Sequence, residues 1–290
     1  MKIAIAGSHG LIGTNLVTHF RKSNINVTRI VRLKDQNGIY WDPITGYINH
    51  ENLENYDAII NLCGEKIASF NPFFKNKNKL ISSRVSTNLI LSKTIAKLVN
   101  PPKYFITASA TGIYKPTKRR ITESGKLNSG FLAQLALEWE EASKFYDNGK
   151  TKIINLRLGQ VISPQSFYFK ALSNITKYMK ISSFGNGKQR WPWVSINDIN
   201  EAIDFIIDSD QIEFALSSGQ IKVHSTIISR FETVDEKGNK KFEKYTSTAG
   251  RFLLANLLPK NSNIKFSLID RLLPKKVVSE IIDIVFRFCG

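Results

Sequence analysis

The sequence predicts an α/β protein built on a doubly wound parallel sheet, followed by a short α+β appendage. Short apolar runs alternate with amphipathic stretches through residues 1–213, and only short connections separate them. The runs are continuously apolar, as expected for strands covered on both faces. Such alternation implies parallel strands joined by right-handed crossovers. The 290 residues suffice for one large domain with an appendage, which we place at 1–213 and 214–290.

The first expected elements are a buried strand at residues 2–6 and a helix that follows a glycine-rich turn. The helix is indicated by apolar residues at helical spacing, namely Leu11, Leu16, Val17 and Phe20. The same reasoning places further strands at 27–31, 57–63, 104–109 and 153–158, and helices at 77–99 and 130–146.

The pattern changes near Phe214. Residues 221–232 alternate like a strand of an antiparallel hairpin, 234–241 form a charged turn, and 242–246 return. Two short helices are expected at 250–258 and 276–288, with Pro259 and Pro274 as breakers. This part lacks the strand-helix rhythm of the first 213 residues, so we treat it as a separate appendage.

The net charge of +17 would suit a nucleic acid or an anionic membrane surface. The basic excess is spread along the whole chain and is rich in lysine, which favours a general compositional bias over a binding patch. Cys63 and Cys289 form neither a disulfide framework nor a metal-binding pattern, so we expect no metal site and a reducing cytoplasm. The first apolar run ends at Ser8, too early for a signal peptide or a membrane span.

The turn after the first strand has the spacing GxxGxxG, with Gly7, Gly10 and Gly13. A pyrophosphate needs backbone N–H groups and a helix N-terminus close to it, with no side chains in between. Leu11 and Ile12 open the helix and complete the predicted cofactor-binding set of this turn. The spacing is looser than GxGxxG, so a purely structural turn is the alternative, but its place directly after the first strand favours a Rossmann-type dinucleotide site. We assign no role to His9.

The end of the second strand discriminates between NAD and NADP. An acidic residue there binds the ribose 2′-hydroxyl of NAD, whereas an arginine pairs with the 2′-phosphate of NADP. Here Arg32 follows the strand and no carboxylate occurs before Asp35. The sequence therefore predicts NADP, with NAD as the alternative if Arg32 is an ordinary exposed arginine.

Residues 1–213 resemble the atypical extended short-chain dehydrogenase/reductase group, and within it the bacterial epimerase-family proteins of the NAD-dependent epimerase/dehydratase type. Segments 5–13, 41–43, 58–68, 83–87, 109–114, 131–140 and 190–198 carry the resemblance. It implies that Leu62, Gly64 and Glu65 lie along the ribose and nicotinamide, and that Leu158 ends the strand beside the nicotinamide. It leaves the substrate open between a sugar-nucleotide-like molecule and a small carbonyl compound.

Hydride transfer in this superfamily normally uses a tyrosine and a lysine four residues later, because the lysine lowers the pKa of the phenol. Aligning the helix on Glu140 places Leu132 and Ala136 at these two positions. Ser109 resembles the family's carbonyl-binding serine and Tyr114 is the nearest remaining phenol, so these are the candidate catalytic residues. Purely structural roles at a strand end and in the core are the alternatives. We expect weak or absent turnover.

Residues 215–290 resemble a segment of the bacterial RNA polymerase β′ subunit. Segments 215–224, 248–259, 273–276 and 281–290 carry this resemblance. The β′ motif NADFDGD, whose aspartates hold the catalytic Mg²⁺, is absent from the chain, so this segment cannot polymerise RNA by itself. The alternative hypothesis is therefore a chimeric chain or pseudo-enzyme carrying a polymerase fragment, and only this alternative predicts nucleic acid or polymerase core as a partner.

Overall fold

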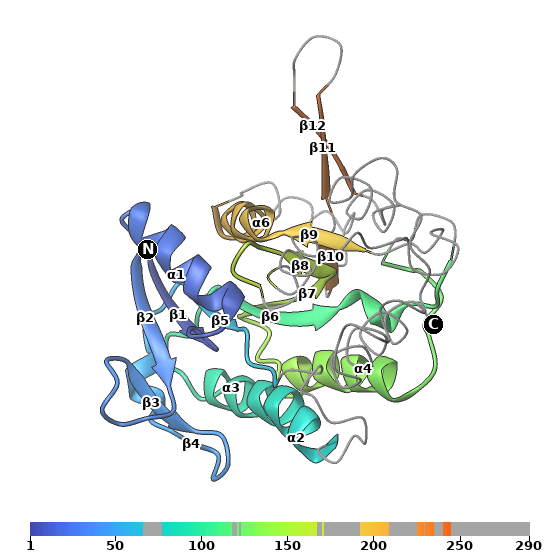
Figure 1. Ribbon diagram of the computed structural model, residues 1–290. Helices are drawn as coiled ribbons and strands as arrows, with labels where there is room; N and C mark the ends of the chain where they lie inside the picture. The colour runs from blue at the N-terminus through green and yellow to red at the C-terminus, as the bar shows by residue number, and fades with distance from the viewer. Residues whose placement is uncertain are drawn as a thin grey trace, which may run out of the picture.

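The computed structural model describes residues 1–65, 77–117, 121, 123–166, 170, 192–208, 225–228, 230–234 and 240–244. Within these residues the main sheet has eight strands in the order β10-β7-β6-β5-β1-β2-β3-β4 (Figure 1). All neighbouring strands are parallel except β3 and β4. The strands are β1 (Lys2–Ala6), β2 (Asn26–Val31), β3 (Ile39–Asp42), β4 (Tyr47–Ile48), β5 (Ala58–Asn61), β6 (Tyr104–Ala110), β7 (Lys152–Leu158) and β10 (Ser225–Ile228).

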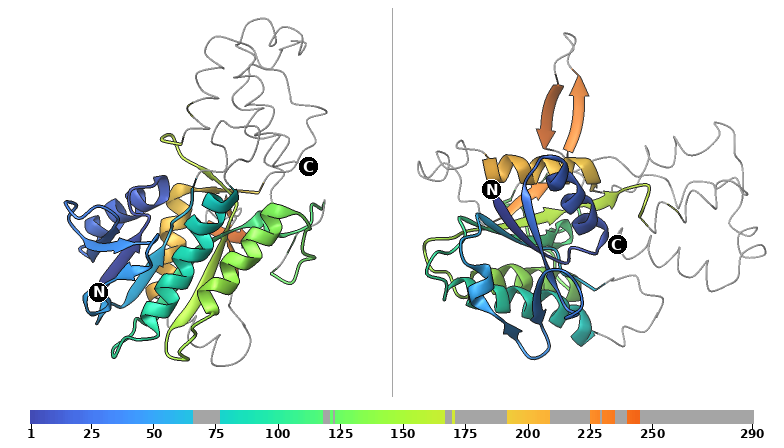
Figure 2. Two further views of the ribbon diagram at one scale, coloured as in Figure 1. Left: turned by 90° about the horizontal axis from the view of Figure 1, so that it is seen from below. Right: turned by 90° about the vertical axis from the view of Figure 1, so that its left-hand side faces the viewer.

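Helices cover both faces of this sheet (Figures 1 and 2). On one face lie α1 (Leu11–Lys22) and α6 (Ile196–Asp208), and on the other α2 (Lys77–Ile81), α3 (Thr87–Ile95) and α4 (Phe131–Lys144). His19 Nε2 on α1 lies 2.5 Å from Asp204 Oδ2 on α6 and joins the two helices of the first face. This arrangement confirms the predicted doubly wound α/β fold. None of the helices in the described ranges combines the length and apolar character that crossing a membrane requires.

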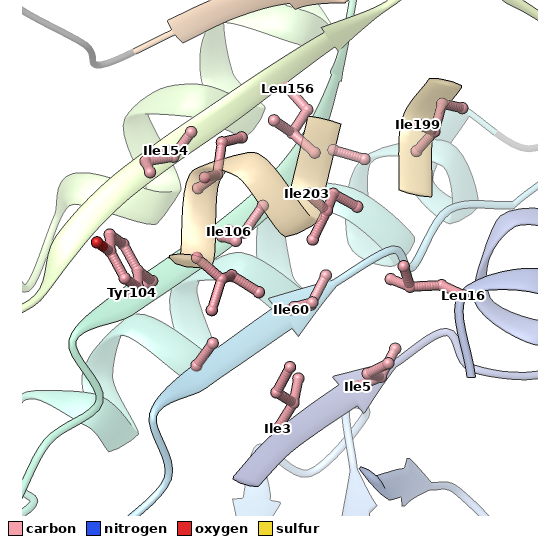
Figure 3. Close-up of a cluster of buried hydrophobic side chains, with 14 of the residues drawn as sticks. Ile3, Ile5, Leu16, Ile60, Tyr104, Ile106, Ile154, Leu156, Ile199 and Ile203 are labelled. Atoms are coloured by element: carbon pink, nitrogen blue, oxygen red, sulfur yellow. The ribbon is translucent and has the colours of Figure 1, made fainter. Parts of the chain in front are cut away.

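Two apolar layers hold the helices against the sheet. Figure 3 shows the layer under α1 and α6, where strand residues such as Ile5 and Ile60 meet Leu16 of α1 and Ile203 of α6. A second cluster under α3 is built around Leu91 and the neighbouring strand faces. Burying one such side chain stabilises the fold by roughly 1.5–3 kcal/mol, so these layers hold the helices on the sheet.

The sheet contains strands that the sequence did not predict. The hairpin of β3 and β4 adds an antiparallel edge beside β2. The expected single strand at 221–232 is wrong: its first part is β10, which lies parallel to β7, and its second part belongs to β11 (Arg230–Val234). Alternation alone could not reveal this, because an edge strand and a hairpin strand share the same period.

The expected hairpin is nevertheless present, since β11 pairs antiparallel with β12 (Lys240–Lys244). A further parallel pair, β8 (Gln160–Ile162) with β9 (Trp193–Ser195), and the helix α6 had no counterpart in the prediction. The predicted boundary near Phe214 and the helices expected at 250–258 and 276–288 lie outside the described residues.

The helix predicted at 77–99 is interrupted. Between α2 and α3 the chain makes a π-helical turn, Ser82–Ser86. Such turns widen a helix by one residue and re-aim its side chains. Here the turn carries Arg84, whose side chain is buried between α4 and the end of β5.

Candidate functional site

The carboxyl ends of the parallel strands bring most of the predicted site residues to one edge of the sheet. Gly7 follows β1, Arg32 follows β2, and Leu62 to Glu65 follow β5, while Ser109 and Leu158 lie at the ends of β6 and β7. The chain leaves β1 toward β2 and later returns to β5 on the other side. The strand order therefore reverses beside β1, which is where open α/β sheets place their ligands.

Two of the three glycines of the turn are required by the protein itself. Gly7 has a φ of +72°, and a Cβ there would lie 2.6 Å from the carbonyl carbon of Leu62. A Cβ on Gly13 would lie 2.4 Å from the carbonyl oxygen of Gly7, so α1 packs directly on the turn. These contacts fix the turn against the end of β5.

Gly10 differs, because a Cβ there would meet only the carbonyl oxygen of Gly7, at 3.3 Å. It is the N-cap of α1, no side chain caps the helix there, and the first turn contains no acidic residue. The N–H groups and the positive end of the helix dipole are thus left for a ligand, an arrangement that suits a phosphate. Leu11 and Ile12 are half-buried in this first turn, and Ile12 also packs against the core.

The end of β2 is basic. Arg32 directly follows β2 and is exposed, which fits both a ligand-facing cation and an ordinary surface arginine. Burial raises the pKa of the neighbouring Cys63 thiol to about 12, and the charge of Arg32 acts against this rise. Arg29, which the sequence analysis missed, also reaches this edge, where its Nη1 donates to the carbonyl oxygen of Ser8 at 2.6 Å.

The segment after β5 is held by the last side chain of β5 and by two side chains of the turn between α2 and α3. Asn61 Oδ1 accepts from the backbone N–H of Cys63 at 3.1 Å, and Ser83 Oγ accepts from that of Glu65 at 3.0 Å. Arg84 Nη2 donates to the carbonyl oxygen of Glu65 at 2.8 Å. A Cβ on Gly64 would lie 3.3 Å from this nitrogen, so the absent side chain makes room for the guanidinium. The segment therefore has a fixed backbone course beside the glycine turn.

A buried ion pair between Arg157 and Glu140 lies near the ends of β6 and β7. Arg157 of β7 donates from Nε to Glu140 Oε1 at 2.7 Å and from Nη2 to Oε2 at 2.6 Å. Ser109 Oγ donates to Glu140 Oε1 at 2.6 Å. A carboxylate that pairs with guanidinium through both oxygens only accepts hydrogen bonds. The single hydroxyl hydrogen of Ser109 is therefore directed to Glu140.

The second candidate, Tyr114, belongs to the same cluster. Its hydroxyl accepts a hydrogen bond from Arg157 Nη1 and donates to the carbonyl oxygen of Glu123 at 3.3 Å. Burial raises the pKa of the phenol, against the opposing effect of the Arg157 charge. The side chain is 5% exposed, so the Tyr114 proton faces the protein interior.

The helix positions expected to lack the acid–base pair do lack it. Ala136 is buried and packs beside Tyr114 and Ile113, and Leu132 is half-buried one turn earlier. Glu140 and Arg157 were missed as members of this cluster. The available signal was Arg157 itself, because a charge within a continuous apolar strand requires a buried partner.

A doubly wound sheet with an open glycine turn after its first strand defines the Rossmann class of nucleotide-binding folds. The chain belongs to the NAD dependent epimerase/dehydratase family, whose model matches residues 3–214. An epimerase family protein of Mycobacterium leprae is 31% identical over 218 residues, covering 74% of this chain and 70% of the relative. One of Mycobacterium bovis is 33% identical over 208 residues, covering 71% and 68%.

Solved structures show the same fold. A human epimerase family protein with NADPH matches with a TM-score of 0.67 at 20% identity, over 97% of this chain and 88% of that one. A nucleoside-diphosphate sugar epimerase of Corynebacterium glutamicum matches with a TM-score of 0.64 at 21% identity, over 99% and 66%. Nothing in these matches supports the resemblance of residues 215–290 to RNA polymerase β′.

Proposed function

We propose that this protein binds a nicotinamide dinucleotide at the carboxyl edge of the sheet, prefers NADP(H), and turns over weakly or not at all. The observation that carries the proposal is the turn at Gly10. There the chain supplies backbone N–H groups and a helix N-terminus, and among the described residues no side chain caps that end of the helix or meets the Cβ position of Gly10. The human relative in complex with NADPH supports the same cofactor class.

The preference for NADP(H) rests on Arg32. This arginine follows β2 and is exposed, and among the described residues no carboxylate lies within salt-bridge distance of it. A 2′-phosphate would supply the missing anion, whereas the hydroxyl of NAD would not. Leu62, Gly64, Glu65 and Leu158 would line the ribose and nicotinamide from the ends of β5 and β7.

The expectation of low turnover rests on the ion-pair cluster, by which we mean Ser109, Tyr114, Glu140 and Arg157. A bound nicotinamide supplies hydride chemistry, and the protein must then move a proton at the reacting oxygen. Ser109 and Tyr114 both direct their hydrogens into the protein. Neither is positioned to donate to a ligand without breaking a buried hydrogen bond, which is costly.

The direct test is equilibrium titration of the full chain with NADPH and NADH, followed by cofactor fluorescence and by thermal shift. We expect saturable binding of NADPH, with weaker binding of NADH. Arg32→Gln should bring the two affinities together, while Lys34→Gln, which removes a neighbouring exposed charge, should leave their ratio largely unchanged.

Two results would contradict the proposal. Absence of any fluorescence change or thermal shift with millimolar cofactor would show that the protein does not bind a dinucleotide. Reduction of a carbonyl substrate at an ordinary rate, on the order of 10 per second, would contradict the expectation of weak turnover. Ser109 or Tyr114 would then again be a candidate catalytic residue.

A further inference from the structure

Arg29 is an arginine in the body of strand β2 whose guanidinium reaches the glycine turn. Its neighbours in the strand, Val27 and Ile30, pack into the two apolar layers on opposite faces, and Arg29 shares the face of Val27. The guanidinium is half-buried and contacts the carbonyl oxygen of Ser8 at 2.6 Å. Among the described residues this neutral carbonyl is the one hydrogen-bond acceptor of the guanidinium.

The surroundings of Arg29 are poor in negative charge. Within the described part of the chain no carboxylate lies within salt-bridge distance of Arg29. Asp204 of α6 is already paired with His19. Burial and the like charge of Arg21 both lower the pKa of the Arg29 guanidinium. A partly desolvated cation without a counter-ion is unfavourable, and a bound anion would relieve this cost.

A second arginine follows the same strand. Arg32 comes directly after β2 and is exposed. Arg29 approaches the glycine turn through Ser8, from the face that carries α1. Between the two lies the end of β2, where the ribose phosphate of a dinucleotide with its pyrophosphate at Gly10 would fall.

We propose that Arg29 is a second phosphate-binding residue, which together with Arg32 makes the site selective for a dinucleotide carrying a phosphomonoester on its adenosine ribose. This rests on the proposed function, because it requires a dinucleotide at the glycine turn. Planar guanidinium groups suit the oxygens of a phosphomonoester, and a dianion between two arginines is bound by charge-assisted hydrogen bonds. If Arg29 only supported the turn, its loss would weaken the binding of every dinucleotide equally. If Arg29 binds the phosphate, its loss weakens the binding only of dinucleotides that carry the extra phosphate.

The test compares NADPH with NADH on the full chain, using cofactor fluorescence at several salt concentrations. Arg29→Gln should weaken NADPH binding by about tenfold and change NADH binding by less than about twofold, since only the charged contact to the phosphate is lost. Arg29→Lys should recover part of the NADPH affinity, because it restores the charge without the planar fork. Added salt should weaken NADPH binding more than NADH binding in the wild type, and Arg29→Gln should reduce this difference.

Lys97→Gln provides a matched loss of one exposed charge away from this edge and should change neither affinity. Urea unfolding of each variant separates loss of affinity from loss of structure. An equal loss of both cofactors in Arg29→Gln would make Arg29 a brace of the turn and overturn the proposal, as would unchanged NADPH binding. Failure of the wild type to bind either cofactor would instead remove the proposed function.

Discussion

The two halves of the carboxyl edge treat their polar groups in opposite ways. At the glycine turn, backbone N–H groups, Arg29 and Arg32 lack an anionic partner in the described structure. In the ion-pair cluster, the hydroxyls, the carboxylate and the guanidinium bind one another and are almost fully buried. An open polar site is available for a ligand, and a closed one contributes to the fold. The difference teaches that polar groups at one edge of one sheet can be left without partners in one region and satisfy one another in the next.

The largest expected effect is a loss of stability when the ion-pair cluster is broken. Glu140→Ala should destabilise the protein by about 3–5 kcal/mol, because it leaves the Arg157 guanidinium buried without its counter-ion. Glu141→Ala is the matched control: its carboxylate is exposed and, within the described part of the chain, pairs with Lys144 alone, so it should cost less than about 0.5 kcal/mol. Urea unfolding measures both. A cost below about 1 kcal/mol for Glu140→Ala would show that the cluster is not part of the fold's stability.

The next largest effect concerns the glycine turn and its contact with the end of β5. Gly7→Ala should cost about 2–3 kcal/mol, since it combines a positive φ with a Cβ that collides with the backbone of Leu62. Gly46→Ala is the control, because Gly46 has a φ of +75° and no atom within 4 Å of its Cβ position. Its cost should be only the conformational term, about 1 kcal/mol. Equal losses of melting temperature in the two variants would mean that the close approach at Gly7 is unimportant.

A smaller effect should appear in binding alone. Gly10→Ala places a Cβ 3.3 Å from the carbonyl oxygen of Gly7 and, among the described residues, against no side chain, so the free energy of unfolding should fall by less than about 1 kcal/mol. The same methyl group enters the space proposed for the pyrophosphate and should weaken NADPH binding about tenfold, or 1.4 kcal/mol. Titration and thermal shift on one sample would separate the two quantities. Unchanged NADPH affinity would place the cofactor elsewhere.

The smallest expected effect is a loss of stability on removing the hydroxyl of Tyr114 in the ion-pair cluster. Tyr114→Phe should cost about 1 kcal/mol through the lost hydrogen bonds to Arg157 and Glu123. Because burial raises the pKa of Tyr114 in the folded state, its contribution is fully present below the unfolded pKa, near pH 10, and is lost as pH rises through the higher folded pKa. The difference in stability between wild type and Tyr114→Phe should therefore shrink as the pH rises above about 10, the pKa of the phenol in the unfolded chain. A difference that grows over this range would contradict the assigned environment of the phenol.

Much of the fold was predictable because continuous apolar runs and glycine turns act locally. The strands at β1, β2, β5, β6 and β7 and the glycine turn after β1 lie where the sequence placed them. The strands β3 and β4 escaped prediction because four and two residues, respectively, leave too short a periodic signal at an edge. The destination of β10 was hidden for a different reason: pairing with β7 depends on which edge of the sheet is free, and no local pattern records that.

The sequence by itself determined the fold class, the family and the position of the glycine turn, because each depends on residues that are neighbours in the chain. It also showed that Leu132 and Ala136 stand where a tyrosine and a lysine would be expected. Only the tertiary structure brought Glu140 of α4 to Arg157 of β7 and turned the hydrogen of Ser109 toward them. Only the tertiary structure, likewise, placed Arg29 beside Ser8. Charges and hydroxyls act through space, so their roles are decided by which elements the fold packs together.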